Sequence, residues 1–319
     1  MPITLSVRNA DLVRFRFALS PIWETLAAVR TLLLPARHAV QLPWLRAVEA
    51  HRGDAAASVL AALLPERGYV PDFLTPPPTS PLACIDEELA RVRRTPRGRV
   101  VAELRRATGR RPHPQLQRWI EEPARGAHEA ADLIEKWWQR IVAQDWARIR
   151  DTLDADIAYR AGRMTQGGLA AVTEDLHVSV GWADSRLTVA GASGRGVLGG
   201  RGLVLMPSVF GWPSVKVILD RPWQPTLIYP ARGVGDLWQP AVRTTDSSLA
   251  ALLGPTRARV LAAVGEPIST TNLAARLGMS PATVSSHLGV LRRAGLLAAH
   301  RVGHQVRYSR SALGHQLVL

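Results

Sequence analysis

The sequence predicts an α+β protein with a mainly helical N-terminal domain, a small antiparallel β unit and a C-terminal winged helix-turn-helix. Three observations lead to this prediction. Apolar residues recur at helical spacing through the first half of the chain, the spacing shortens to two after Leu176, and the last segment carries the signals of helix, turn, helix and β-hairpin in that order. We therefore expect domains at 1–175, 176–244 and 245–319.

The N-terminal domain is expected to open with a short strand, because apolar residues alternate over 3–7. The clearest of the helices that follow begins at Ser20-Pro21, where a hydroxyl that can cap the helix precedes a proline that fits its first turn. A long helical region at 127–156 is rich in tryptophan. We expect these aromatic side chains to pack in a core, and an apolar ligand pocket between helices is the sharper alternative.

Charged and proline-rich stretches of this domain leave several interpretations open. Residues 71–81 are either a linker or a packed extended segment. The arginines of 91–106 predict a solvated helix face that pairs with the acidic residues of 86–88, and the alternative is a surface that contacts phosphates or a partner. Asp154 and Asp156 are expected to be ordinary surface charges.

The middle segment has the period of β-strands and connects the helical domain to the last segment. A hairpin is expected between 178 and 189, and later strands are expected at 203–210, 215–219 and 226–229. The glycine-rich stretch 194–202 is expected to be a turn and not a phosphate-binding loop, because no helix follows it and no Gly-Lys-Ser/Thr is present.

The last segment carries the strongest pattern. A short helix is expected over 270–277, and Gly278 suits the turn because glycine tolerates the backbone that a helix C-terminus needs. Ser280 and Pro281 are an N-cap residue and a first-turn proline that begin a second helix. Two strands follow around a tight turn at 302–304. This order predicts a winged helix-turn-helix, a module that places its second helix in the major groove of DNA.

The second helix has a buried stripe and an exposed face. Val284, Leu288 and Leu291 have the spacing of a stripe that packs on a core. The other face carries small side chains that form hydrogen bonds and allow close approach to base edges and phosphates. The residues expected at this contact are Ser280, Ala282, Thr283, Ser285, Ser286 and His287. The residues expected to contact the DNA backbone from the helix end and the wing are Arg292, Arg293, Arg301, Arg307 and Tyr308.

The charge of the chain agrees with a polyanionic partner. The formal net charge is +14 and the isoelectric point is about 11.3. Because Lys136 and Lys216 are the only lysines and arginine supplies the rest, the placement of the charge says more than its total. The segment 245–319 holds eight arginines and two acidic residues, which is the densest net positive charge of the three expected domains.

Other classes of site lack support in the sequence. Cys84 is the single cysteine, so neither a disulfide framework nor a thiolate metal cluster is expected. GxSxG, HExxH and paired-cysteine motifs are absent, so we expect no enzyme, no cofactor and no metal site. The histidines at 300, 304 and 315 are too weak a signal for a metal. No signal peptide or membrane-spanning stretch is found, and a cytoplasmic location is expected.

Three stretches of the last segment carry a family resemblance. Residues 253–261 read LGPTRARVL, residues 279–288 read MSPATVSSHL, and residues 291–296 read LRRAGL before a wing that ends in Arg307-Tyr308. Together they resemble the arsenic-repressor (ArsR/SmtB) regulators, whose opening helix has Asp-Pro-Thr-Arg-x-x-Ile-Leu and whose recognition helix has Ser-x-x-Thr-Val-Ser-x-His-Leu.

This resemblance implies a homodimeric bacterial repressor that binds double-stranded operator DNA and leaves it when an effector binds. Metal-sensing members carry Cys-x-Cys in the helix before the turn, and residues 272–277, NLAARL, lack it, so metal sensing by thiolates is not implied. The rest of the chain resembles an uncharacterised helical extension of longer members from high-GC bacteria. That similarity lies in SPIWE at 20–24, YVPDFL at 69–74 and YPARG at 229–233, and it implies no ligand.

The expected function is therefore that of a dimeric, sequence-specific transcriptional repressor whose N-terminal part dimerises, senses a small-molecule effector, or both. Two alternatives stay open. One is a small-molecule-binding or enzymatic N-terminal domain with a regulatory DNA-binding tail. The other is a winged helix used for protein interaction.

Overall fold

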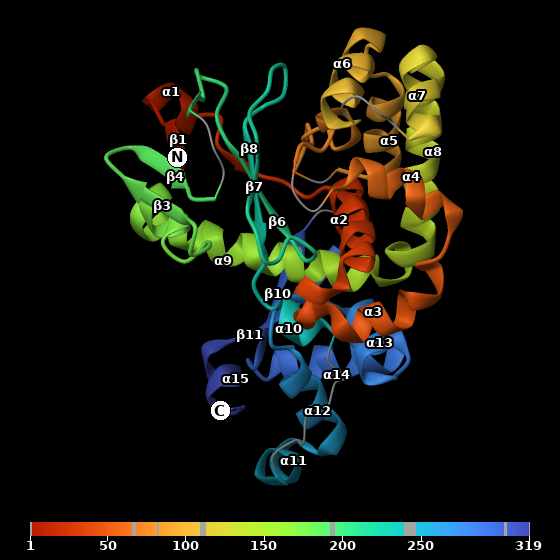
Figure 1. Cartoon of the computed structure of the whole chain (residues 1–319). Helices are drawn as coiled ribbons and strands as arrows, with labels where there is room; N and C mark the ends of the chain where they lie inside the picture. Colours follow the sequence, from red (N-terminus) through yellow and green to blue (C-terminus); the bar gives the residue numbers. More distant parts are fainter. Residues whose placement is uncertain are drawn as a thin grey trace. The chain divides into compact units, whose positions relative to one another are not determined.

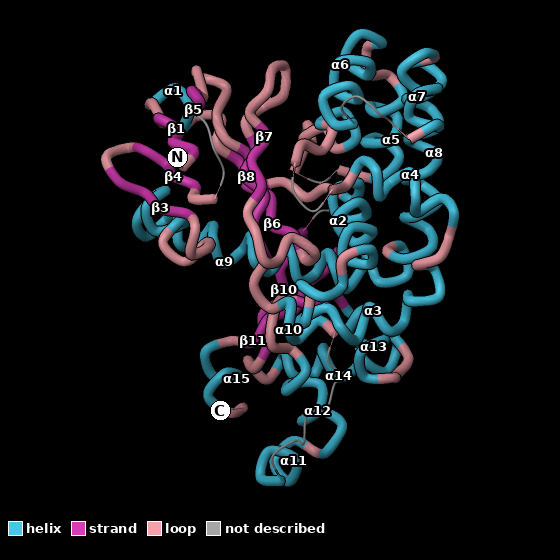
Figure 2. Tube along the Cα trace, in the orientation of Figure 1, coloured by secondary structure: helices cyan, strands magenta, loops and turns pink. Residues whose placement is uncertain are grey.

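The computed structural model describes residues 2–65, 68–81, 83–108, 113–191, 195–238, 247–302 and 305–318. The chain forms two compact units, whose elements are labelled in Figure 1 and coloured by type in Figure 2. The first comprises Met1–Trp146 and Asp156–Gly235, and the second comprises Ala147–Ala155 and Asp236–Leu319. The sequence predicted three domains, but the strands of the middle one pair with strands from the N-terminus and belong to the first unit.

The helices of the first unit come mainly before residue 174. They are α1 (Asn9–Leu12), α2 (Pro21–Leu33), α3 (Leu42–Val48), α4 (Ala55–Leu63), α5 (Ile85–Arg93), α6 (Arg97–Thr108), α7 (Pro114–Glu121) and α8 (Pro123–Ile141). The next helix, α9 (Trp146–Thr173), contributes its residues 147–155 to the second unit and the remainder to the first. Within the described residues, no helix is long and apolar enough to cross a membrane.

Helix α2 begins at the predicted cap. The Ser20 hydroxyl accepts a hydrogen bond from the Trp23 amide at 3.0 Å, and Pro21 occupies the first turn. The Glu88 carboxylate of α5 accepts bonds from the Ile22 amide at 2.9 Å and from the Ser20 hydroxyl at 3.1 Å. These bonds fix the start of α2 to α5.

Trp137 and Trp138 lie in the core of the helical part, as expected, and Trp146 is half-buried. Trp137 is fully buried in α8, and Trp138 packs edge-on against Trp146 with ring centroids 5.0 Å apart. The proline-rich stretch after residue 70 is also packed, since Phe73 and Leu74 have no exposed surface. Of the two interpretations of that stretch, the packed segment is therefore the one observed.

The first unit contains two four-stranded sheets. One has the order β3 (Val180–Ala183), β4 (Arg186–Val189), β1 (Ile3–Ser6) and β5 (Arg195–Val197). The other has the order β2 (Arg16–Phe17), β6 (Val204–Ser208), β8 (Thr226–Pro230) and β7 (Lys216–Ile218). The α+β class is confirmed, and the hairpin of β3 and β4 is antiparallel as predicted. The sheets are nevertheless mixed, because the pairs β1–β5, β2–β6 and β6–β8 are parallel.

The two faces of the second sheet have different neighbours. Leu227 of β8 belongs to a core that it shares with Val172 of α9. Ile218 of β7 and Ile228 of β8 belong to a smaller cluster against which Trp23 of α2 packs. The sheet thus lies between part of α9 and α2 within the first unit.

The second unit has the elements of a winged helix-turn-helix. After α10 (Val234–Leu237), at the boundary of the units in the sequence, it contains α11 (Ser247–Leu253), α12 (Pro255–Ala263), β9 (Ile268–Ser269), α13 (Thr270–Leu277), α14 (Pro281–Arg293), β10 (Leu297–Val302), β11 (Gln305–Arg310) and α15 (Ala312–Gln316). The three strands form one sheet in the order β10-β11-β9. Helix α13 has the predicted bounds, and α14 begins at the predicted proline.

Candidate DNA-binding site

The turn between α13 and α14 is held by backbone geometry. Gly278 has φ 65° and ψ 34°, the left-handed conformation that favours glycine. The Met279 amide donates to the Ala274 carbonyl at 3.0 Å, which closes the C-terminus of α13. At the start of α14, the Ser280 hydroxyl accepts a hydrogen bond from the Thr283 amide at 3.1 Å. These bonds fix the direction in which α14 leaves the turn.

Helix α14 has one buried stripe and one exposed face. Its residues Val284, Leu288 and Leu291 are at most 1% exposed and pack in the core of the second unit. The residues predicted to meet DNA bases from this helix lie on the other side. Ser280, Ala282, Thr283, Ser285 and Ser286 are exposed, and His287 is half-buried. The predicted recognition face is therefore accessible.

Of the residues predicted to contact the DNA backbone, three arginines are exposed and one tyrosine is half-buried. Arg292 and Arg293 are exposed in the last turn of α14, and Arg301 is exposed on β10. Tyr308 of β11 is half-buried and packs against the core of the unit. The tip of the wing, at 303–304, lies outside the described residues.

Arg307 differs from this expectation. Its side chain is 4% exposed, and its Nη2 atom lies 3.0 Å from Oδ1 of Asp151 and 2.6 Å from Oδ2 of Asp154. Both carboxylates belong to the first turns of α9, in the segment 147–155 that is part of the second unit. In this conformation the guanidinium of Arg307 does not face solvent, so we leave it out of the DNA-binding surface. Asp154 is likewise no ordinary surface charge.

A second contact joins the same part of α9 to the helix-turn-helix. The side-chain amide of Asn272 in α13 donates to the Ala147 carbonyl at 3.1 Å and also to the Asp151 carboxylate. Burial raises the pKa of Asp151 and of Asp154, while the charge of Arg307 acts in the opposite direction. Sequence analysis missed this cluster, because it unites a helix and a module that are more than 100 residues apart.

Asp156 was also expected at the surface, and it is buried within the first unit. Its carboxylate accepts hydrogen bonds from the Tyr229 hydroxyl at 2.7 Å and from the Arg232 amide at 3.2 Å. Its Oδ2 atom lies 3.4 Å from Nε of Arg160, which is fully buried. Burial raises the pKa of Asp156, against the effect of Arg160. This cluster is structural, since Tyr229, Arg232 and Arg160 of the chain itself surround the carboxylate.

The arginines of α5 and α6 find partners other than the expected acidic stretch. Arg93 pairs with Asp132 and Glu135 of α8, each at 2.9 Å. Arg106 pairs with Asp220. Ion pairs with neighbouring elements therefore account for part of this charge, and these pairs differ from the predicted ones with residues 86–88.

No group of three or more potential metal-ligating side chains lies together in the part of the chain that the structure describes. His300 and His315 are exposed, and His304 falls outside the described residues. The histidines of the wing thus give no support to a metal centre.

Two separate parts of the chain match known protein families. Residues 252–299 match a family described as a helix-turn-helix domain, and residues 95–235 match a family of unknown function (DUF5937). Over 60 residues, the chain is 45% identical to the HTH-type transcriptional regulator CmtR of Mycobacterium tuberculosis and of Mycobacterium bovis. The second unit carries a helix-turn-helix domain.

The similarity to the CmtR proteins covers only the helix-turn-helix domain. The aligned residues are 18% of this chain and 51% of the CmtR proteins, so the chain spans about half the length of the curated relatives it matches. No solved structure matches the chain significantly. The helix-turn-helix domain therefore accounts for only part of this chain.

Proposed function

We propose that this protein is a sequence-specific DNA-binding transcriptional regulator, and that it acts as a dimeric repressor released from its operator by an effector. The observation that carries the proposal is the exposed, uncharged face of α14, which lies between a capped N-terminus and the exposed Arg292 and Arg293. Similarity to helix-turn-helix transcriptional regulators supports the same function.

The side chains of α14 suit the major groove of DNA. Thr283 and Ser286 carry hydroxyls that can donate to or accept from base edges, and Ala282 fits against a thymine methyl group. Because these side chains are short, the helix can approach the bases closely. A well-made base contact contributes ~1–3 kcal/mol of discrimination.

Exposed arginines supply the contacts with phosphates. Arg292 and Arg293 lie at the end of α14, and Arg301 lies on the wing strand β10. Arg257 and Arg259 are exposed on α12 and add to the positive charge of the unit. Each phosphate that such a residue neutralises releases a condensed counterion, so binding is expected to weaken steeply with salt.

The dimer and the mode of repression rest on the family resemblance. Two copies place two α14 helices in successive major grooves, about 34–36 Å apart, on an operator with two-fold symmetry. A dimer bound across a promoter excludes the transcription machinery. An effector then acts by favouring the conformation that does not bind DNA.

The experiment begins with selection of genomic fragments by the full-length protein, followed by fluorescence anisotropy titrations. Thr283→Ala and Ser286→Ala are expected to weaken binding of a selected fragment about tenfold or more, with little effect on a random duplex. Thr165→Ala, an exposed threonine of α9 in the first unit, is the matched control. The full chain is used because residues 147–155 are part of the second unit.

The outcome separates DNA recognition from protein recognition. Enrichment of no fragment, or equal affinity of the α14 variants and the wild type for a selected fragment, contradicts the proposal. Either result favours a winged helix that binds a protein.

A further inference from the structure

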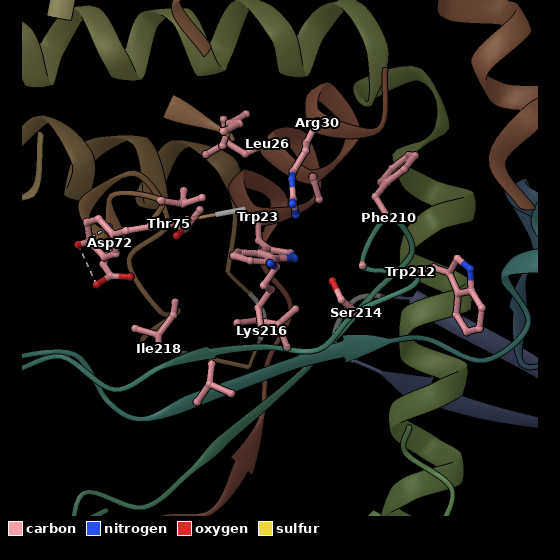
Figure 3. A pocket seen from close by; sticks show the side chains of 18 of the residues that line it. Trp23, Leu26, Arg30, Asp72, Thr75, Phe210, Trp212, Ser214, Lys216 and Ile218 are labelled. Carbon is pink, nitrogen blue, oxygen red and sulfur yellow. Dashed lines mark hydrogen bonds between the residues drawn. The ribbon is translucent and has the colours of Figure 1, made fainter. Parts of the chain in front are cut away.

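The first unit contains a cavity of about 470 Å³ between α2 and the sheet formed by β2, β6, β8 and β7. Figure 3 shows side chains from both walls pointing into it. This volume is in the range of small-molecule sites. The cavity lies away from the tryptophan-rich helices in which the sequence suggested an apolar pocket.

One face of α2 forms the first wall. Trp23, Leu26 and Arg30 line the cavity, and their spacing of three and four residues places them on one side of the helix. The indole N–H of Trp23 is buried and has no hydrogen-bond partner among the described residues. A buried donor without a partner costs free energy, so a ligand that accepts from it is favoured.

The sheet forms the opposite wall. Lys216 and Ile218 of β7 both line the cavity, as alternation along a strand requires, and Ile228 of β8 lies beside them. In Figure 3, Lys216 and Arg30 reach toward Trp23 from opposite walls. The cavity therefore has an apolar, aromatic surface with two cations near its centre.

An ordered loop forms one end of the cavity. The buried Glu24 carboxylate accepts hydrogen bonds from the Val209 amide at 3.1 Å and from the Phe210 amide at 3.4 Å. The Phe210 ring packs against Trp44, with ring centroids 4.6 Å apart. Because its backbone is held by Glu24 and its ring packs against Trp44, Phe210 presents a fixed aromatic surface to the cavity.

The cation on β7 is unusual. No hydrogen bond or ion pair joins the Lys216 ammonium group to another of the described residues. Burial lowers its pKa, and the positive charge of Arg30 lowers it further. A partly buried ammonium group without a carboxylate beside it favours an anion at that position.

At the other end of the cavity, Asp72 and Arg106 have partners within the chain. Asp72 accepts a hydrogen bond from the Tyr69 hydroxyl at 3.1 Å. Arg106 lies over the Tyr69 ring, 3.8 Å from its centroid, and pairs with Asp220. An anionic ligand is therefore expected to place its charge at Lys216 and its ring toward Trp23 and Phe210.

We propose that this cavity binds a small aromatic anion, whose ring packs against Trp23 and Phe210 and whose carboxylate or sulfonate pairs with Lys216. A ligand of one or two rings fits the volume. The role of this ligand as the effector rests on the proposed function, whereas its binding does not.

Two fluorescent probes of matched shape test the binding. 1-Anilinonaphthalene-8-sulfonate carries the anion, and N-phenyl-1-naphthylamine has the same rings without it. Lys216→Met keeps the aliphatic stem and removes the charge. We expect it to raise the dissociation constant of the sulfonate about tenfold and to leave that of the neutral amine within about twofold. Lys136→Met, at the other lysine of the chain, is the control, because Lys136 is exposed on α8.

A second variant tests the place of binding. Ala27 lines the cavity from α2, and Ala27→Phe fills part of it, so it is expected to weaken both probes while the far-ultraviolet circular dichroism spectrum stays that of the wild type. The proposal is overturned if Lys216→Met and Lys136→Met bind the sulfonate equally well. It is also overturned if a folded Ala27→Phe variant keeps wild-type affinity for both probes.

A third measurement separates this proposal from the proposed function. The sulfonate is added to the full-length protein on a selected DNA fragment, and we expect it to change the affinity for DNA at least fivefold in the wild type and not in Lys216→Met. Probe binding that depends on Lys216 in a protein without DNA affinity supports the cavity and contradicts the proposed function. DNA binding without Lys216-dependent probe binding supports the proposed function and contradicts the proposed ligand site.

Discussion

The guanidinium of Arg307 lies 2.6 Å from the carboxylate of Asp154, so a strand of the wing is joined to the first turns of α9 by a buried ion pair. Asp151 is a second partner at 3.0 Å. Nε and Nη1 of Arg307 have no hydrogen-bond partner among the described residues, so Arg307 is held mainly by charge, while Asn272 donates a hydrogen bond to Asp151. Burial raises the pKa of both carboxyl groups, and Arg150, whose Nε lies 3.5 Å from Asp154, is the second cation beside them.

Loss of Arg307 is expected to destabilise the second unit. Arg307→Met leaves Asp151 without its ion pair and Asp154 with Arg150 alone, and breaking a buried pair from one side costs roughly 3–5 kcal/mol. Hydrogen exchange of the core amides of α14 at pH 8 measures the effect. Arg292→Met, at an exposed arginine of the same unit, is expected to change stability by less than about 0.5 kcal/mol. Equal exchange in the two variants would show that the cluster contributes nothing.

Buried carboxyl groups make the stability of the first unit depend on pH. Burial raises the pKa of Glu24 and of Glu88 to about 7, well above the ~4.3 of an exposed glutamate. Between these values the folded chain binds more protons than the unfolded chain, so stability is highest at low pH within this window and falls as pH rises toward 7. Each group contributes up to about 1.4 kcal/mol per pH unit within that window.

Urea unfolding between pH 4.5 and 8 measures this dependence. Intrinsic fluorescence follows mainly the first unit, because Trp238 is the only one of the ten tryptophans in the second. In the double variant Glu24→Gln, Glu88→Gln the slope is expected to be much smaller, while the amide oxygens keep accepting from the same backbone groups. A double variant with the wild-type slope would assign the pH dependence to other residues.

Two helical glycines give a matched test of packing. A Cβ atom at Gly126 of α8 would lie 2.7 Å from Cβ of Trp119 and 2.9 Å from its Cα, so Gly126→Ala must displace α7 and is expected to cost about 1–3 kcal/mol. Gly162 of α9 is exposed and has no atom within 4 Å of an added Cβ, so Gly162→Ala is expected to stabilise by about 0.5–1 kcal/mol. Urea unfolding monitored by fluorescence compares them, and the same sign for both changes would refute this account.

Sequence patterns located the C-terminal module because each part of it is local. The cap at Ser280, the turn at Gly278 and the stripe through Leu288 depend on residues a few positions apart, so their spacing determines the structure. The buried stripe also predicted which face of α14 is exposed, because the exposed face lies opposite to it.

The remaining features depend on contacts between distant segments. Parallel pairing of β6 with β8 leaves no periodic signal that differs from antiparallel pairing. The cavity joins α2 to β7, and Lys216 had no neighbour in the sequence to indicate its role. Arg307 was predicted to meet DNA because a wing arginine usually faces solvent, and only the packing of α9 shows that it is buried.

The exposed arginines of the second unit are expected to control the salt dependence of DNA binding. Arg293→Met removes one positive charge from the end of α14, so the slope of log K against log salt should decrease by about one for the selected fragment and for random DNA alike. Anisotropy titrations between about 50 and 200 mM salt, where salt changes the affinity strongly, measure the slope. Arg125→Met, at an exposed arginine of the first unit, should leave it unchanged.

Lys216 is expected to lower the free energy of unfolding of the ligand-free protein. A partly buried ammonium group near Arg30 loses hydration and is repelled, and no carboxylate of the described residues contributes to its pKa. Lys216→Met should therefore raise the free energy of unfolding by about 1 kcal/mol while it weakens binding of the aromatic sulfonate. Urea unfolding at pH 7 in the presence and absence of the sulfonate measures both effects. A variant less stable than the wild type without ligand would show that Lys216 has a structural role and is not a residue held ready for an anion.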